Sequence, residues 1–156
     1  MDLPQTRETT VARIAELLSG IRIAIVTTVT TDGRLHSRPM ASQDMDFDGV
    51  LWFVTRRDTD KVHEARDNHH ASVAFVDSVR NRYVTLSGSI RIVEDRAKIH
   101  EIWHEALNAW FPNGPADPEL TLLRMEPVEA SFWEGPASRL SQAFRIVQAL
   151  TGLPPS

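Results

Sequence analysis

Two Asp-Gly pairs between extended segments constrain this chain more than any other feature of the sequence. The pairs are Asp32-Gly33 and Asp48-Gly49, and the segments that they separate are 23–29, 35–45 and 50–54. Asp-Gly between two extended segments is a strong hairpin signal, because glycine adopts positive φ angles without steric cost. The pattern therefore predicts a three-stranded antiparallel meander, followed by the start of a helix near Lys61.

This arrangement brings two cations close to one helix N-terminus. Arg38 lies in the middle predicted strand and Lys61 just after the third, while Thr59 or Asp58 precedes a helix expected at 60–68. Each cation by itself is more often an ordinary surface residue. Together with free helix N–H groups, an arginine and a lysine favour an anion such as a phosphate.

The rest of the chain indicates one mainly β domain with helices (α+β) over residues 1–156. Further helices are expected at 4–20, 95–109 and 138–150, and further strands at 71–77, 83–93, 120–125 and 128–133. Pro39 predicts an edge or a bulge in the second strand, and Gly88 predicts a bulge or a close backbone approach in the fifth. Several short strands separated by turns are typical of a closed or nearly closed antiparallel barrel.

The composition argues against several classes of protein. Lys and Arg number 17 against 21 Asp and Glu, and a net charge of −4 does not favour a nucleic-acid or anionic-membrane partner. The absence of cysteine excludes disulfides, iron–sulfur clusters, thiolate zinc sites and a cysteine nucleophile. No signal peptide and no apolar run of about 18 residues is present, so we expect a cytoplasmic protein.

Three segments occur in an order and spacing that resemble a known family. They are Ser37-Arg38-Pro39-Met40, then Trp52-Phe53-Val54-Thr55 with Thr59-Asp60-Lys61, and finally Phe132 to Leu140, which fits aromatic-Trp-x5-Arg-Leu. The chain resembles the pyridoxamine 5′-phosphate oxidase-like FMN-binding split barrels, and most closely their general stress protein branch. This resemblance implies a six-stranded Greek-key split barrel and a homodimer with FMN in each of two clefts at the subunit interface.

The resemblance also implies roles for individual residues. Arg38 and Lys61 would hold the FMN phosphate, and Thr59 would add a hydroxyl. Residues 52–55 would lie along the isoalloxazine ring, and Trp133 would reach across from the other subunit. The full set that the resemblance assigns to the cofactor is Arg38, Pro39, Met40, Trp52, Phe53, Val54, Thr55, Thr59, Lys61, Trp133 and Arg139.

Departures from the family pattern bear on activity. In the family's oxidase the Arg-Leu pair is followed by His-Asp-Arg, whereas Ser141-Gln142-Ala143 follows here. Oxidation of pyridoxamine 5′-phosphate is therefore not expected, and we assign no catalytic residue. A flavin-dependent oxidoreductase with a small-molecule electron donor or acceptor is one hypothesis. A non-catalytic protein that stores or senses flavin is another, and a related barrel that uses haem or a deazaflavin is a third.

A second motif points to different chemistry. His100-Glu101-Ile102-Trp103-His104 fits H-E-x-x-H, in which two histidines on a helix bind zinc and the glutamate is a general base. Short motifs often match by chance, and the same segment reads well as an amphipathic surface helix. A zinc hydrolase is therefore the remote alternative.

Overall fold

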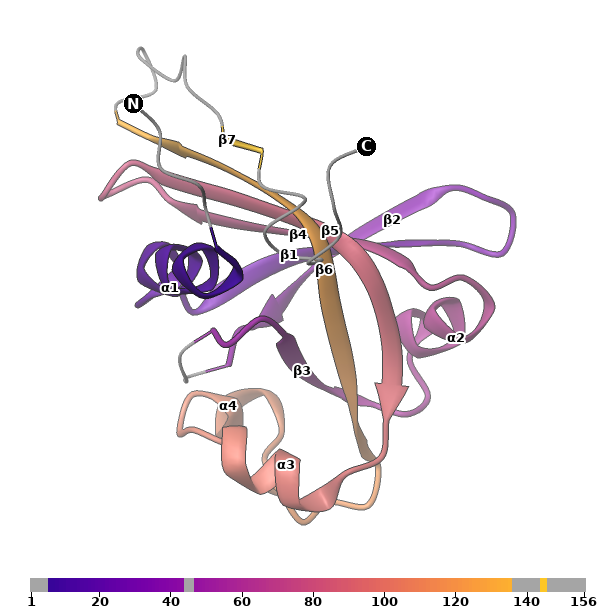
Figure 1. Cartoon of the computed structure of the whole chain (residues 1–156). Helices are drawn as coiled ribbons and strands as arrows, with labels where there is room; N and C mark the ends of the chain where they lie inside the picture. Colours follow the sequence, from indigo (N-terminus) through magenta and orange to yellow (C-terminus); the bar gives the residue numbers. More distant parts are fainter. Residues whose placement is uncertain (1–5, 44–46, 136–143, 146–156) are drawn as a thin grey trace.

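Six long antiparallel strands form one curled sheet in the order β2-β1-β4-β5-β6-β3 (Figure 1). The computed structural model describes residues 6–43, 47–135 and 144–145. The strands are β1 (Ile23–Val29), β2 (Leu35–Ala41), β3 (Leu51–Arg56), β4 (His70–Asp77), β5 (Arg82–Val93), β6 (Leu120–Glu134) and the two-residue β7 (Phe144–Arg145), which pairs with β6. The helices are α1 (Arg7–Leu18), α2 (Asp60–Asp67), α3 (Arg96–Ile102) and α4 (Leu107–Trp110). This architecture confirms the predicted α+β split barrel.

The first Asp-Gly turn forms the expected hairpin, but the second does not. Strands β1 and β2 pair in register around Gly33, which has a φ of 88°. Strand β3 pairs with β6 instead of β2, so the predicted meander is wrong at its second turn. This crossing leaves β2 as an edge strand of the sheet, where the missing N–H of Pro39 is tolerated, as predicted.

Strand β6 is continuous where two strands were predicted. Glu126 and Pro127 do not end it, because a register shift between Ser87 and Gly88 on β5 accommodates the proline. A Cβ at Gly88 would lie 2.1 Å from the Glu126 carbonyl oxygen, so this position requires glycine. The close backbone approach predicted at Gly88 is therefore confirmed.

Strand alternation divides the apolar side chains between two clusters. The larger one fills the barrel and includes Ile14, Leu17, Val26, Phe53, Phe75, Leu86 and Ile90. The smaller one lies beneath α3 and α4 and consists of Val54, Ile99, Ile102, Leu107, Phe111, Leu120 and Leu122. Successive residues Phe53 and Val54 of β3 thus face different clusters, which places β3 between the barrel interior and the α3–α4 segment.

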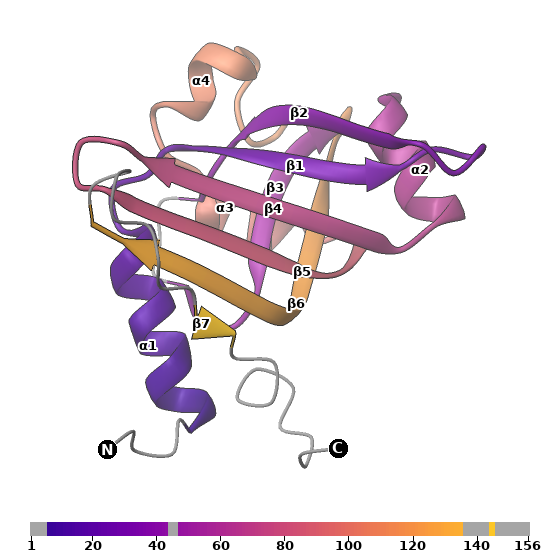
Figure 2. The ribbon, with the colours of Figure 1, turned by 90° about the horizontal axis from the view of Figure 1, so that it is seen from above.

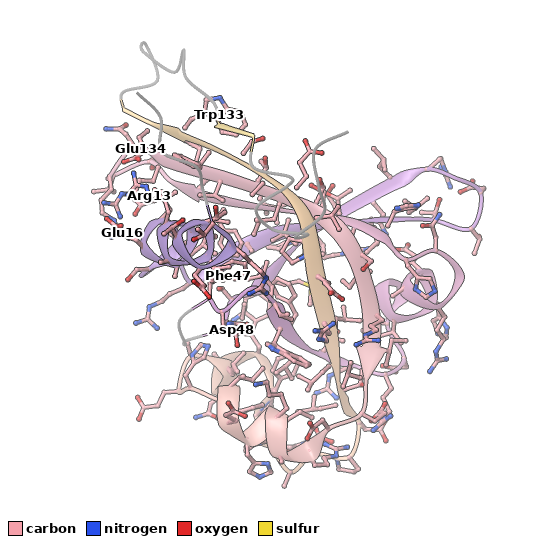
Figure 3. All side chains as sticks on the ribbon, in the orientation of Figure 1. Arg13, Glu16, Phe47, Asp48, Trp133 and Glu134 are labelled. Carbon is pink, nitrogen blue, oxygen red and sulfur yellow. The ribbon has the colours of Figure 1, made fainter. Side chains whose placement is uncertain are left out.

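Arginine side chains hold helix α1 against one end of the sheet through hydrogen bonds and ion pairs. Arg80 donates to the Ser19 carbonyl at 2.5 Å and Arg82 to the Glu16 carbonyl at 3.4 Å, which satisfies acceptors at the C-terminus of the helix. Arg13 forms ion pairs with Glu16 and with Glu134 at the end of β6 (Figure 3). The helix predicted at 4–20 therefore forms over Arg7–Leu18.

Two other helix predictions need correction. The segment predicted as one helix at 95–109 is broken at Trp103, whose ψ of 138° separates α3 from α4. The helix predicted at 138–150 is wrong at Phe144–Arg145, which form β7, and the rest of that range lies outside the described residues. None of the helices in the described part of the chain is long and apolar enough to span a membrane.

Candidate functional site

A pocket of about 140 Å³ lies between β2, β3 and α4, beside the first turn of α2. Its lining residues are Pro39, Met40, Ala41, Val54, Thr55, Arg56, Thr59, Trp110 and Phe111. The fold thus gathers a subset of the predicted cofactor residues, namely Pro39, Met40, Val54, Thr55 and Thr59. The side chains of Lys61 and Arg139 lie outside the described part of the structure.

The walls of this pocket are largely apolar. Met40, Val54 and Phe111 are each less than a tenth exposed, and Trp110 is 44% exposed at the rim. Aliphatic and aromatic walls with a few polar groups are typical of sites for planar ligands. The α4 side of the pocket has apolar walls of this kind.

Polar groups without protein partners lie on the opposite side, towards α2. Thr55 is only 2% exposed, yet its hydroxyl makes no hydrogen bond to any described residue. The guanidinium of Arg56 likewise has no hydrogen bond or ion pair within the described ranges. Arg56 is half-buried, so its guanidinium can contact solvent or a ligand.

Helix α2 begins at this pocket without a side-chain cap. The Thr59 hydroxyl donates to the Arg56 carbonyl at 3.0 Å and does not cap the helix. The first N–H groups of an α-helix have no intrahelical acceptor, and the helix dipole favours an anion there. The geometry around Thr59 therefore suits a negatively charged group.

Arg38, predicted as a phosphate ligand, does not line the pocket but is paired beneath α2. Its Nη1 donates to the Thr28 hydroxyl at 2.7 Å and its Nη2 to Glu64 Oε2 at 2.8 Å. Glu64 is 7% exposed, accepts a hydrogen bond from Thr28, and lies 3.0 Å from His36 Nδ1.

The charge of Glu64 balances that of Arg38. Burial by itself would raise the pKa of Glu64, but hydrogen bonds from Thr28, His36 and Arg38 outweigh it and hold the pKa below its ordinary value. Glu64 is therefore a carboxylate at neutral pH and neutralises Arg38. An incoming phosphate would have to compete with this internal carboxylate.

Trp52 and Phe53, predicted to lie along a flavin ring, do not line the pocket. Phe53 is 1% exposed and belongs to the barrel core. Trp52 packs against the smaller cluster, with Lys98 Nζ 5.1 Å and the Arg124 guanidinium 5.8 Å from its ring centroid. Two cations over one indole form favourable cation–π contacts and hold Trp52 in place.

Trp133 lies far from the pocket of its own chain. It pairs with Tyr83 near the end of β6, whereas Thr121, twelve positions earlier, pairs with Thr55 at the pocket. Twelve strand residues span about 40 Å along the strand. Figure 3 shows Trp133 at the end of the sheet opposite α3 and α4. The expectation that Trp133 serves the other subunit stays a prediction.

The zinc-hydrolase hypothesis is wrong. Helix α3 ends at Ile102, so His104 is not one helical turn beyond His100, and His104 Nε2 donates instead to the Ser42 carbonyl at 3.0 Å. His100 Nδ1 lies 3.0 Å from the Arg96 carbonyl oxygen. Within the described ranges no group of three or more His, Cys, Asp or Glu side chains is placed to hold a metal ion.

Sequence reasoning missed four residues of the pocket: Ala41, Arg56, Trp110 and Phe111. Ala41 and Arg56 directly follow predicted site residues, and this adjacency was a usable signal. Trp110 and Phe111 follow β3 by more than fifty positions in the chain, and the fold of the α3–α4 segment brings them to the pocket. No local pattern in the sequence indicates that placement.

Known structures share this architecture. A protein related to general stress protein 26 from Clostridium acetobutylicum superposes with a TM-score of 0.72 at 23% identity, covering 89% of this chain and 94% of that one. A structure described as the general stress FMN/FAD binding protein from Xanthomonas citri gives a TM-score of 0.68 at 27% identity, covering 83% of this chain and 92% of that one. The split-barrel fold is thus shared with general stress proteins.

The sequence also matches a curated relative and a family model. Protein bli-3 from Neurospora crassa is 28% identical over 109 residues, which are 64% of this chain; the match spans about half, 52%, of that relative's length. The model described as "Pyridoxamine 5'-phosphate oxidase like" matches residues 9–153. The chain therefore belongs to the pyridoxamine 5′-phosphate oxidase-like family.

Proposed function

We propose that the pocket between β2, β3 and α4 binds FMN non-covalently in a homodimer. The observation that carries this proposal is the combination of apolar walls with the N-terminus of α2, which has no side-chain cap at Thr59, on one pocket. The 27% identical relative from Xanthomonas citri, described as an FMN/FAD binding protein, supports the same ligand class.

The residues present fit a flavin in two parts. Met40, Val54 and Phe111 would pack against the ring, where apolar contact and shape complementarity stabilise a planar ligand. Thr59 and Lys61 at the start of α2 would face the phosphate, where the helix dipole and free N–H groups favour an anion. Arg38 would join them only by exchanging Glu64 for the phosphate.

The size of the pocket supports a second subunit. About 140 Å³ is less than half of the roughly 300 Å³ at which sites for drug-sized ligands begin. One chain therefore supplies part of a flavin site, and a second copy would complete it.

The outer face of the sheet supports the same conclusion. Ile23 and Ile25 of β1 are 43% and 40% exposed, although apolar side chains on a sheet are normally covered. A row of cross-strand neighbours on this face carries no charge: Pro39, Ile25, Ala74, Thr85 and Ser131. Figure 2 looks onto this face, and none of the described helices crosses β1, β2 or β4 there. Trp133 and its neighbour Tyr83 lie on it too, as a residue serving the other subunit would.

The chemistry would come from the cofactor and the positioning from the chain. A bound flavin supplies one- and two-electron transfer, and the protein supplies binding and orientation. Among the described residues, no Asp, Glu or His lines the pocket. This absence of an acid or base fits a flavin-dependent oxidoreductase that relies on its cofactor, and it equally favours a non-catalytic protein that stores or senses flavin. Oxidation of a reduced nicotinamide by the flavin-loaded protein would select the former.

The test of flavin binding uses a matched pair of threonines. Thr55→Val removes the hydroxyl of a residue that lines the pocket, and we expect FMN affinity, measured by flavin fluorescence quenching, to fall about fivefold, as for a typical hydrogen bond. Thr10→Val is the control, because Thr10 is a threonine buried to the same extent, but on α1. Equal FMN affinity in both variants, or a wild-type protein that binds no flavin, would contradict the proposal.

A further inference from the structure

A second pocket, of about 150 Å³, lies between the C-terminal end of α1 and the loop that joins α3 to α4. We call it the His104 pocket, after the histidine that lines it from that loop. Its apolar walls include Leu18, Ile21, Phe47 and Leu51. An apolar cavity of similar volume holds a molecule the size of benzene, so this pocket has room for one small ring but not for a flavin.

The His104 pocket contains a buried hydrogen-bond acceptor without a partner. Among the described residues, two buried side-chain atoms make no hydrogen bond, Thr10 Oγ1 and His104 Nδ1, and of these two residues only His104 lines the pocket. Because His104 Nε2 donates to the Ser42 carbonyl oxygen at 3.0 Å, Nδ1 of the neutral ring is an acceptor. A buried acceptor without a donor is costly, and an O–H or N–H group on a ligand would remove that cost.

The surroundings of this imidazole favour a neutral ligand. The hydrogen bond from Nε2 to Ser42 holds the ring in one orientation, so Nδ1 is already in place for a donor. The side chain of Gln43 is engaged elsewhere, because its Oε1 accepts the Trp52 N–H at 2.7 Å. Arg22 also lines the pocket, but it is exposed and its charge is therefore solvated. The buried part of the pocket thus combines apolar walls with a fixed acceptor.

We propose that the His104 pocket binds a small neutral molecule that consists of one ring with a hydroxyl or N–H donor, such as a phenol. The donor of this molecule bonds to His104 Nδ1, and its ring packs against the apolar walls. The proposal is independent of flavin binding, because the two pockets share no described residue. Ser42 follows Met40 of the flavin pocket by two positions, about 7 Å of extended chain, so the two sites are neighbours.

The experiment compares phenol with benzene, which has the same ring but no donor. Dissociation constants are measured by isothermal titration calorimetry for wild type, His104→Phe, His100→Phe and Ala15→Leu. We expect His104→Phe to weaken phenol about 2- to 10-fold, as for one lost hydrogen bond, and benzene less than about twofold. His100→Phe is the matched control, because His100 is exposed on α3 and does not line the pocket. Ala15→Leu fills the pocket from α1 and should weaken both probes.

A direct readout in the wild-type protein needs no variant. In nitrogen NMR of histidine-labelled protein, the His104 Nδ1 signal should move upfield with phenol, as for an acceptor that gains a hydrogen bond, and much less with benzene. An Nδ1 signal that phenol leaves in place overturns the proposal, as does an equal loss of affinity for phenol in His104→Phe and His100→Phe. A wild-type protein that binds neither probe shows that the pocket holds only water, and this result also overturns the proposal.

Discussion

Removal of the Glu64 carboxylate should destabilise this protein strongly. Glu64 on α2 contacts Thr28 on β1 and both His36 and Arg38 on β2, so it joins the helix to the edge of the sheet. The side chains of Glu64 and Arg38 are 9% and 15% exposed. Glu64→Ala would leave a buried guanidinium without its counterion.

The expected loss follows from the burial of this pair. Breaking a buried ion pair by removing one partner costs about 3–5 kcal/mol, because the remaining charge stays desolvated. Residual exposure of Arg38 places Glu64→Ala near the lower end, about 3 kcal/mol. For a chain of this size, each kcal/mol lowers Tm by about 2–4 °C, so we expect a decrease of about 6–12 °C.

Urea and thermal unfolding followed by circular dichroism would measure this loss. Glu101→Ala is the matched control, because Glu101 also pairs with a cation, Lys98 at 3.3 Å, but is 57% exposed on α3. Exposed pairs contribute about 0–1 kcal/mol. A Glu64→Ala protein that loses no more stability than Glu101→Ala would show that the Glu64–Arg38 pair contributes no more than an exposed ion pair.

Three further predictions follow from the fold and the proposed dimer. The folded-state pKa of Glu64 lies below its ordinary value of 4.5, so the stability that Glu64 contributes is complete above pH 4.5 and is lost as the pH falls through the folded-state pKa. Urea midpoints should therefore fall more steeply on acidification in wild type than in Glu64→Gln. Gly88→Ala should lower stability by about 1–3 kcal/mol in urea unfolding, since its Cβ would meet the Glu126 backbone; an unchanged midpoint would argue against the close approach. Ile25→Arg should yield monomers in analytical ultracentrifugation, whereas Val79→Arg, in a turn and 90% exposed, should not; dimers in both would remove the outer sheet face as the interface.

The sequence specified hairpins and strand types better than strand partners. Asp32-Gly33 forms its hairpin because the turn and the pairing are both local. Asp48-Gly49 has the same local signal, yet β3 pairs with β6, some seventy positions away in the chain. The choice of the strand that closes the barrel depends on the burial of side chains such as Phe53. The turn residues carry no information about this choice. The sequence around Pro127 predicts a strand end, because the compensating irregularity lies on a different strand, at Ser87 and Gly88 of β5.

The candidate site shows the same difference between local sequence signals and contacts that are distant in the chain. The resemblance found the β2 and β3 positions of the pocket, because they lie in short contiguous motifs. It assigned Arg38 to the FMN phosphate, but it gave no sign of the ion pair between Arg38 and Glu64, which lies 26 positions further along the chain. It also passed over Arg56, which lines the pocket. Charge pairing across the fold, which one sequence does not reveal, decides which cations are open to a ligand.

The most direct test of the central claim is an absorption spectrum of the purified protein after incubation with FMN and desalting. Flavin bound in the pocket survives desalting and gives its visible absorption band, and we predict one FMN per chain. A colourless protein that retains none of FMN, FAD or riboflavin would contradict the claim that this chain binds flavin.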